Sequence, residues 1–257
     1  MRQPATPPID LRPIVCRGAP RDMGADEGYA LAARAVAKDR RWGSRRGSPA
    51  ERRTLRDLRR HIPQQSERLI ALAEVLGLQP AGLVAQLDRD AVSICWGPDG
   101  HPVVPREGGR LRRSLPDAGF SSLEWQPRET AVPALGVNAS GLRVLAVLES
   151  SSPRDRRSAA LAIYLLPEVL QRFADARVAR DWLARRPASG TVRFLLADAG
   201  RGDWLHLSKA GEHCAIDTAE RLPTSPASRL GVALRPDGIL WRRTTGEFFY
   251  PVSHRDG

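Results

Sequence analysis

The sequence predicts an α+β fold, and the order of its elements is that of a four-layer αββα sandwich. The first observation is that the hydrophobic period changes along the chain. Helical spacing before residue 88 gives way to short strand-like runs, helical spacing returns up to residue 185, and strand-like runs follow. The second observation is turn chemistry, because Pro, Gly, Asn and Asp separate the short apolar runs. The 257 residues contain no internal repeat, which favours a single domain.

The beginning of the chain is predicted to be a tail, a short strand and a helix. Residues 1–10 are interpreted as a flexible tail, and the apolar residues of Leu11 to Arg17 predict a strand. Pro20 suits the first turn of a helix, which the spacing of apolar residues extends to about Asp39. Residues 42–49 are rich in Gly, Ser and Arg and predict a loop.

Three further helices are predicted before residue 88. Glu51 to Arg60 is a polar helix with two leucines on one side. Pro63 opens the next helix, in which apolar residues recur at helical spacing until Gly77 caps it. A short helix from Pro80 to Leu87 follows. Residues 11–87 are therefore expected to form a mainly helical segment.

A β-hairpin is predicted directly after these helices, within residues 88–107. The apolar runs Ala91 to Cys95 and His101 to Pro105 flank a turn at Gly97 to Gly100. Pro fixes φ and Gly supplies a positive φ, so the turn prediction has a physical mechanism.

A second hairpin is predicted in the middle of the chain. Thr130 to Val137 and Leu142 to Leu148 are apolar runs, and the residues between them, Asn138 to Gly141, are typical of a turn. This turn carries the Asn that is considered below as a site residue.

Two helices are expected after the polar linker at residues 149–157. Ser158 to Ala174 is apolar nearly all round, which implies burial between layers, and Pro167 is expected to kink or divide this helix. Asp175 is expected to cap the second helix, Ala176 to Arg185.

Short strands are predicted for the rest of the chain. The runs are apolar and are bounded by turn residues such as those of Arg235 to Gly238. The predicted strands cover residues 191–197, 203–207, 212–216, 231–234, 239–241 and 247–250.

The formal net charge of +11 raises the question of nucleic-acid binding. Nearly all the basic residues are arginine, and runs such as Arg40-Arg41 and Arg110-Leu111-Arg112-Arg113 are dispersed. A nucleic-acid face needs clustered charge together with stacking residues. We therefore interpret the arginines as a solvated basic surface, and the sequence disfavours a nucleic-acid partner.

The sequence also bears on membranes, location and metals. No apolar run approaches the roughly 18 residues of a membrane span, and the N-terminus lacks the apolar region of a secretory signal. We expect no membrane association and a cytoplasmic location. The three cysteines are widely spaced and the five histidines are scattered, so neither a metal nor a cofactor is expected.

Four motifs, taken in order, resemble a known family. They are Gly18 to Gly24 with Gly28 a turn later, the helix pair from Pro63 to Gln86, the hairpin from Ala91 to Gly100, and the stretch GVNASGL at residues 136–142. Together they resemble the acyl-coenzyme A:6-aminopenicillanic-acid acyltransferases with their peptidase and amidohydrolase relatives, which are N-terminal-nucleophile (Ntn) hydrolases. The resemblance extends to about residue 217. It implies the αββα sandwich, with residues 11–87 equivalent to the family's pro-region and residues 88–257 forming the sandwich core.

The resemblance also implies a catalytic site, of which this chain keeps only part. In the family, a Cys, Ser or Thr attacks the peptide bond before it, and the freed α-amine serves as general base. The matching residue here is Asp90, which cannot perform that acyl shift in the same way, and Arg89 stands where a small residue usually precedes the nucleophile. Arg106 matches a family arginine, but the Asn and Asp that follow it are missing. Asn138 matches the family's oxyanion-holding Asn, and a turn Asn bonding its own backbone is the alternative.

Cys95 is the candidate for a replacement nucleophile. It lies five residues beyond Asp90, so the two side chains face opposite sides of a regular strand. Rescue by Cys95 therefore needs a different register, and a core cysteine is the preferred interpretation. Cys16 is interpreted as a small buried hydrophobe and Cys214 as a half-buried strand residue.

The leading hypothesis is an unprocessed Ntn-hydrolase-fold protein that lacks the usual nucleophile and acts as a binding or partner protein, a pseudoenzyme. The alternative is an active amide (C–N) hydrolase or N-acyltransferase. That enzyme would use Cys95, or Asp90 as a general base with Asn138 and Arg106. The implied partner is a small amide, peptide or acyl ligand, or a protein.

Overall fold

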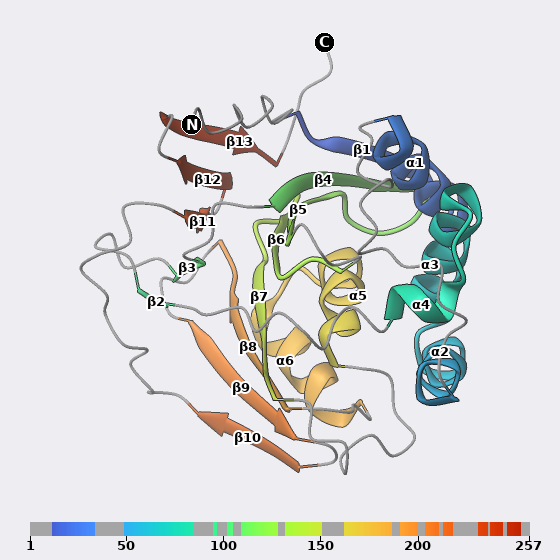
Figure 1. The fold of residues 1–257 in the computed structure, drawn as a ribbon. Helices are drawn as coiled ribbons and strands as arrows, with labels where there is room; N and C mark the ends of the chain where they lie inside the picture. The colour runs from blue at the N-terminus through green and yellow to red at the C-terminus, as the bar shows by residue number, and fades with distance from the viewer. Residues whose placement is uncertain are drawn as a thin grey trace, which may run out of the picture.

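A computed structural model gives the fold of most of the chain (Figure 1). The residues that it describes are 12–33, 49–84, 95–96, 102–104, 109–127, 132–150, 162–186, 191–199, 204–210, 213–217, 231–235, 237–243 and 246–252. Of the residues predicted to form the site, Asp90 and Arg106 lie outside these ranges.

The larger of two β-sheets has eight strands, in the spatial order β1-β4-β5-β6-β7-β8-β9-β10. Strand β1 pairs parallel with β4, and the other neighbours in this order pair antiparallel. The strands are β1 (Ile14–Gly18), β4 (Gly109–Pro116), β5 (Ser122–Pro127), β6 (Leu135–Asn138), β7 (Arg143–Ser150), β8 (Thr191–Ala197), β9 (Leu205–Ala210) and β10 (His213–Asp217).

The smaller sheet has five strands, in the order β13-β12-β11-β3-β2, and its pairs are antiparallel. The pairing of β2 with β3 confirms the predicted hairpin for the residues that the structure covers. The strands are β2 (Cys95–Trp96), β3 (Pro102–Val104), β11 (Gly231–Arg235), β12 (Gly238–Arg243) and β13 (Gly246–Pro251).

Helices α1, α5 and α6 pack on one face of the large sheet. Helix α1 contacts β1 and β4, α5 contacts β6 and β7, and α6 contacts β8 and β9, whereas α3 packs on α1, and α2 and α4 pack on α3 (Figure 1). All of them contribute to one apolar cluster with that face. The helices are α1 (Pro20–Ala33), α2 (Pro49–His61), α3 (Pro63–Leu76), α4 (Pro80–Val84), α5 (Leu165–Arg172) and α6 (Ala176–Arg185). None of these helices is long and apolar enough to span a membrane.

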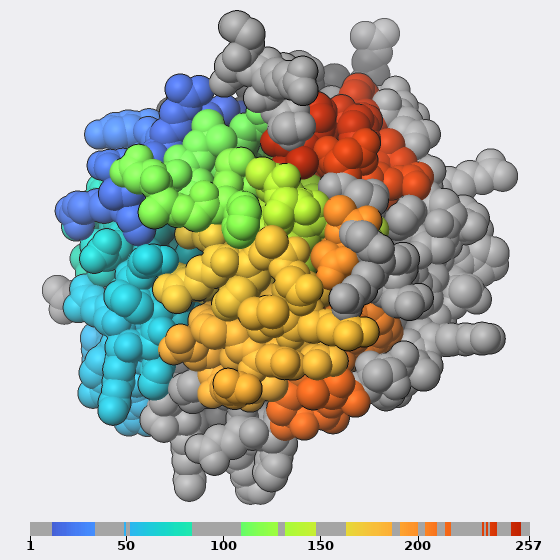
Figure 2. Space-filling model, turned by 180° about the vertical axis from the view of Figure 1, so that it is seen from behind, coloured from blue at the N-terminus to red at the C-terminus, as the bar shows by residue number. Residues whose placement is uncertain are grey.

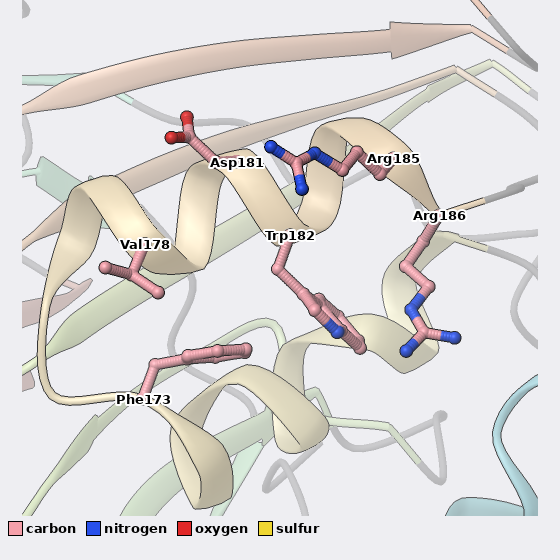
Figure 3. A pocket seen from close by; sticks show the side chains of 6 residues that line it. All are labelled: Phe173, Val178, Asp181, Trp182, Arg185 and Arg186. Atoms are coloured by element: carbon pink, nitrogen blue, oxygen red, sulfur yellow. The ribbon is translucent and has the colours of Figure 1, made fainter.

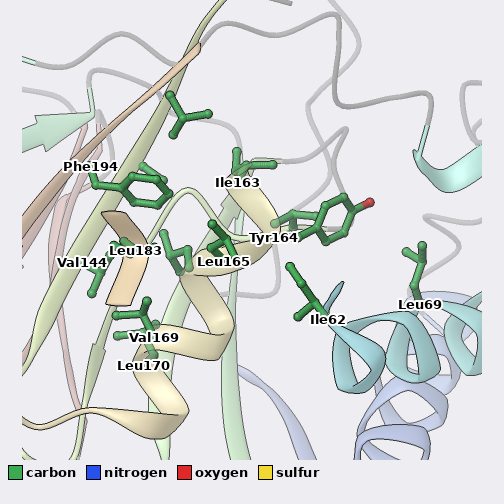
Figure 4. Close-up of a cluster of buried hydrophobic side chains, with 14 of the residues drawn as sticks. Ile62, Leu69, Val144, Ile163, Tyr164, Leu165, Val169, Leu170, Leu183 and Phe194 are labelled. Carbon is green, nitrogen blue, oxygen red and sulfur yellow. The ribbon is translucent and has the colours of Figure 1, made fainter. Parts of the chain in front are cut away.

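Strand alternation separates two cores on the two faces of the large sheet. Val144 and Phe194 point to the helices, and their neighbours Leu145 and Leu195 point to the small sheet. Figure 4 shows the helix-side cluster, where Leu165 and other residues of α5 meet the sheet. Ile239 of β12, in the small sheet, packs with Leu145 and Leu195 in the second cluster. The described residues therefore form one layer of helices and two of strands, and the predicted four-layer arrangement is not shown.

Helices α1 and α3 approach unusually closely, and the glycines of the first motif explain why. A Cβ on Gly24 would lie 2.1 Å from the backbone oxygen of Arg68, and one on Gly28 would lie 2.7 Å from the side chain of Val75. Only glycine fits at such a contact. At the end of α3, Gly77 adopts φ 67° and caps the helix, as predicted.

Several predicted elements are confirmed and others are corrected. Strand β8 and helix α6 have the predicted bounds, and the Asp175 carboxylate caps α6 by accepting from the N–H groups of Arg177 and Val178. Of the long helix expected from Ser158 to Ala174, residues 158–161 lie outside the described residues, and the described part is a 3₁₀ turn (Ala162–Tyr164) followed by α5, with Pro167 in its first turn. A missing N–H costs nothing there. Strands β4 and β5 were not predicted.

Candidate functional site

Asn138 is the predicted site residue whose surroundings are fully described. It ends β6, is completely buried, and donates its two amide hydrogens to the backbone oxygens of Leu170 and Phe173, at 2.8 and 2.7 Å. Its Oδ1 accepts from the backbone N–H groups of Ser140 and Leu142, at 3.1 and 3.0 Å. This is the alternative considered above, a turn Asn that bonds the backbone. In this conformation the side chain has no N–H left for a ligand.

Cys95 lies in β2, and the strand register shows to which side of the small sheet its position belongs. It pairs with Val103, which pairs with Ala233, and the same row continues through Leu240 to Phe249. Residues opposite one another in a sheet share a face. Leu240 and Ala233 form a separate small cluster, whereas the adjacent Ile239 belongs to the core between the sheets. Position 95 is therefore in the row that faces away from the large sheet.

A buried ionic cluster lies between the helices and β4–β5, and the sequence interpretation missed it. Glu27 of α1 is fully buried. It accepts a hydrogen bond from Arg112 Nη1 at 2.8 Å and one from Gln126 Nε2 at 3.0 Å, and it pairs with Arg68 Nη2 at 3.5 Å. Arg112 also pairs with the buried Glu124. We call these five residues the Glu27 cluster.

The electrostatics of the cluster follow from burial and pairing. Burial alone would raise the pKa of Glu27, but the nearby cations Arg112, Arg68 and Arg110 and the hydrogen bond from Gln126 outweigh it and lower the pKa to about 2. Glu27 is therefore held ionised. Cys16 lies against the cluster, and burial raises the pKa of its thiol to about 12, so it is a neutral core residue, as expected.

The Glu27 cluster corrects the interpretation of Arg110 and Arg112 as part of a solvated basic surface. Both are buried, with 8% and 1% exposure. A sequence signal was present, because polar and apolar residues alternate strictly in β5, where Leu123 and Trp125 face the small sheet while Glu124 faces the helices. Such alternation would have identified the strand and its polar inner face.

A second charged group lies at the edge of the layer between the sheets. Arg143, at the start of β7, is 3% exposed, donates from Nη2 to the backbone oxygen of Asp198 at 3.0 Å and stacks over the Trp204 ring at 5.0 Å. Among the described residues, its Nε has no hydrogen-bond partner. Burial lowers the pKa of Arg143, opposed by the nearby Asp198. A buried guanidinium with a spare donor can hold an anionic group.

A surface pocket of about 540 Å³ lies along α6 (Figure 3). None of its lining residues belongs to the apolar cluster between the two sheets. Its lining combines aromatic, aliphatic and charged side chains. They are Phe173, Val178, Asp181, Trp182, Arg185 and Arg186.

Other candidate groups are structural. Cys214 is half-buried in β10, as expected, and pairs with Lys209 across the strands. Lys209 is buried and donates to the backbone oxygen of Ala184 at 3.2 Å, near the end of α6. Among the residues that the structure describes, no group of three or more His, Cys, Asp or Glu side chains could hold a metal ion.

The described residues thus define a mixed α/β protein in which two β-sheets pack together under a layer of helices. No family model and no curated protein matches the sequence. The solved structures that match include penicillin V acylase from Agrobacterium tumefaciens, with 18% identity and a TM-score of 0.34. The match covers 52% of this chain and 52% of the acylase, so the chain spans about half the length of that protein. The similarity is distant.

Proposed function

We propose that the chain is an Ntn-hydrolase-like protein that is not processed and that acts by binding a ligand or a partner. The observation that carries this proposal is the hydrogen bonding of Asn138. Its two N–H groups go to backbone oxygens, so the residue that matches the family's oxyanion donor stabilises a turn instead. Asp90 supports the same proposal from the sequence, because a carboxylate cannot make the acyl shift of a Cys, Ser or Thr.

Residues 11–87, which the resemblance matches to the family's pro-region, make contacts that support a permanent, structural role for this segment. Strand β1 is an integral strand of the large sheet, in register with Arg112 to Pro116 of β4. Glu27 of α1 lies buried against Arg112 of the same strand at 2.8 Å. Removing this segment would leave buried charges unpaired, which is strongly destabilising.

The binding interpretation has a candidate anchor in Arg143. Its side chain lies on the face of β7 that also carries Leu145, which packs in the layer between the sheets. A ligand with a carboxylate, such as a free acid or a peptide terminus, would complement the donor that Arg143 leaves unused.

The alternative is an active amide hydrolase or N-acyltransferase that uses Cys95. An attacking thiol needs a lowered pKa or an adjacent base, and it then reacts faster with electrophiles than an ordinary thiol. The row that contains Cys95 faces away from the layer where Arg143 lies, which weighs against a joint site.

Alkylation of the native protein with iodoacetamide at neutral pH tests the two functions. We expect no cysteine to react faster than N-acetylcysteine, when the labelled peptides are quantified by mass spectrometry. The Cys95→Ala variant assigns the signal, and Cys214→Ala is its matched control. Labelling of Cys95 at least tenfold faster than N-acetylcysteine would refute the proposal in favour of an activated nucleophile.

A further inference from the structure

We call the pocket on α6 the α6 groove. One of its walls is held in place by contacts among the protein's own side chains. The Trp182 ring lies 5.5 Å from the Phe173 ring at an interplanar angle of 55°. The guanidinium groups of Arg172 and Arg186 lie 5.9 and 4.6 Å from the centre of the Trp182 ring. These contacts fix the indole and lower the entropic cost of binding against it.

The wall is apolar and accessible. Val178 is 56% exposed and lies one turn before Trp182 on α6, so the two side chains lie on the same side of the helix, turned towards Phe173 (Figure 3). Ala176, Ala179 and Leu183, on the adjacent side of α6, are buried, and Trp182 and Phe173 are partly buried against the same core. Figure 2 shows the surface of α5 and α6 in gold at the centre of that face of the molecule.

The charges of the α6 groove are unbalanced. Asp181 is already paired with Arg180, at 2.8 Å, and Arg172 with Glu168, at 2.7 Å. Arg185 and Arg186 have no carboxylate partner within the described residues. The groove therefore presents two unneutralised cations beside an aromatic wall.

This combination favours an acidic protein segment over the other anionic partners. Nucleic-acid binding would need a series of stacking residues along a basic track, whereas the aromatic residues that line this groove are Phe173 and Trp182, which already contact one another. A membrane surface is too flat to enter a concave site. Trp and Arg are the residue types that dominate protein–protein hot spots.

We propose that the α6 groove docks an acidic segment of a partner protein. The segment places an apolar side chain against Trp182 and its carboxylates on Arg185 and Arg186. The groove lies on the helix layer, outside the core between the two sheets. The inference is therefore independent of whether the chain is processed.

The test uses the indole N–H signals of the full-length protein in a proton–nitrogen NMR spectrum. The chain has six tryptophans, and Trp182→Phe identifies the signal of Trp182 by its loss. The probe is a capped five-residue peptide with a central Phe flanked by glutamates, and its counterpart carries glutamine in place of glutamate. We expect the Trp182 signal to shift saturably with the acidic peptide, and the affinity for the neutral peptide to be at least about fivefold weaker.

Paired variants locate the charge effect. Arg185→Gln combined with Arg186→Gln should weaken binding of the acidic peptide about five- to tenfold, since each partly exposed ion pair contributes modestly. The matched control is Arg59→Gln with Arg60→Gln, which removes two exposed arginines from the last turn of α2 and should leave the affinity within twofold.

Four outcomes would overturn the inference. They are no shift of Trp182 at millimolar acidic peptide, equal binding of the neutral peptide, an equal loss of affinity in the control variant, and a response of Trp182 at lower concentration to oligouridylate or to phosphatidylserine vesicles. The last outcome would assign the groove to a nucleic acid or to a membrane instead.

Discussion

Replacement of Glu27 by Gln tests whether the first part of the chain is joined to the sheet by buried charge. The variant keeps the shape and the hydrogen-bonding capacity of the side chain but leaves Arg112 and Arg68 facing a neutral group. Breaking a buried ion pair on one side costs about 3–5 kcal/mol. The fall of the Glu27 pKa from 4.5 to about 2 gives a similar figure, about 3 kcal/mol, at about 1.4 kcal/mol for each tenfold change.

The assay is equilibrium unfolding in urea together with thermal unfolding. A loss of about 3 kcal/mol should lower Tm by about 6–12 °C in a chain of this length. The matched control is Glu74→Gln, because Glu74 also joins α3 to α1, through Arg21 at 2.6 Å, but is 53% exposed. An exposed pair contributes about 0–1 kcal/mol. Equal destabilisation by the two variants would refute the reasoning.

The pH dependence gives an independent check on Glu27. Its pKa is lower in the folded protein than in the unfolded chain, so its stabilising contribution is complete above about pH 4.5 and is lost as the pH falls towards 2. The difference in unfolding free energy between the natural chain and Glu27→Gln should therefore shrink over that range. A difference that stays constant from pH 6 to pH 2 would contradict the assignment of the effect to this carboxylate.

Three further predictions follow from contacts described above. Gly24→Ala should destabilise the protein by about 1–3 kcal/mol or more in urea unfolding, because its Cβ would meet the backbone oxygen of Arg68 at 2.1 Å, and an unchanged midpoint would contradict the close helix contact. Asn138→Ala should lower the unfolding free energy by about 3 kcal/mol, because it leaves buried backbone groups without hydrogen-bond partners. An unchanged unfolding free energy would instead fit an Asn138 that serves only to hold an oxyanion. Cys16 should resist alkylation at pH 8 until the protein unfolds, while Cys214 reacts in the native state, and rapid native labelling of Cys16 would exclude its burial.

Local signals were sufficient to predict much of the fold. The N-cap at Asp175, the C-cap at Gly77 and the Pro that opens α3 each act through the backbone within a few residues, so the sequence alone locates them. The hairpin of β2 and β3 was predictable for the same reason. Such features do not depend on distant parts of the chain.

What the sequence could not reveal depends on long-range contacts. Glu27, Arg68 and Arg112 are far apart in sequence, and each is typical of a solvated surface when taken alone. Only the packing of α1 and α3 on β4 turns them into a buried cluster. The role of Asn138 likewise depends on Leu170, 32 residues further along the chain.

The central claim, that the chain remains intact, is tested most directly by the mass of the purified protein under denaturing conditions. Denaturation is required because β1 and Glu27 would hold the two parts together even after a cleavage near residue 90. The account predicts a single species at the full-chain mass of 28.2 kDa. Two fragments, the second beginning at Asp90 or Cys95, would contradict the account and identify the nucleophile.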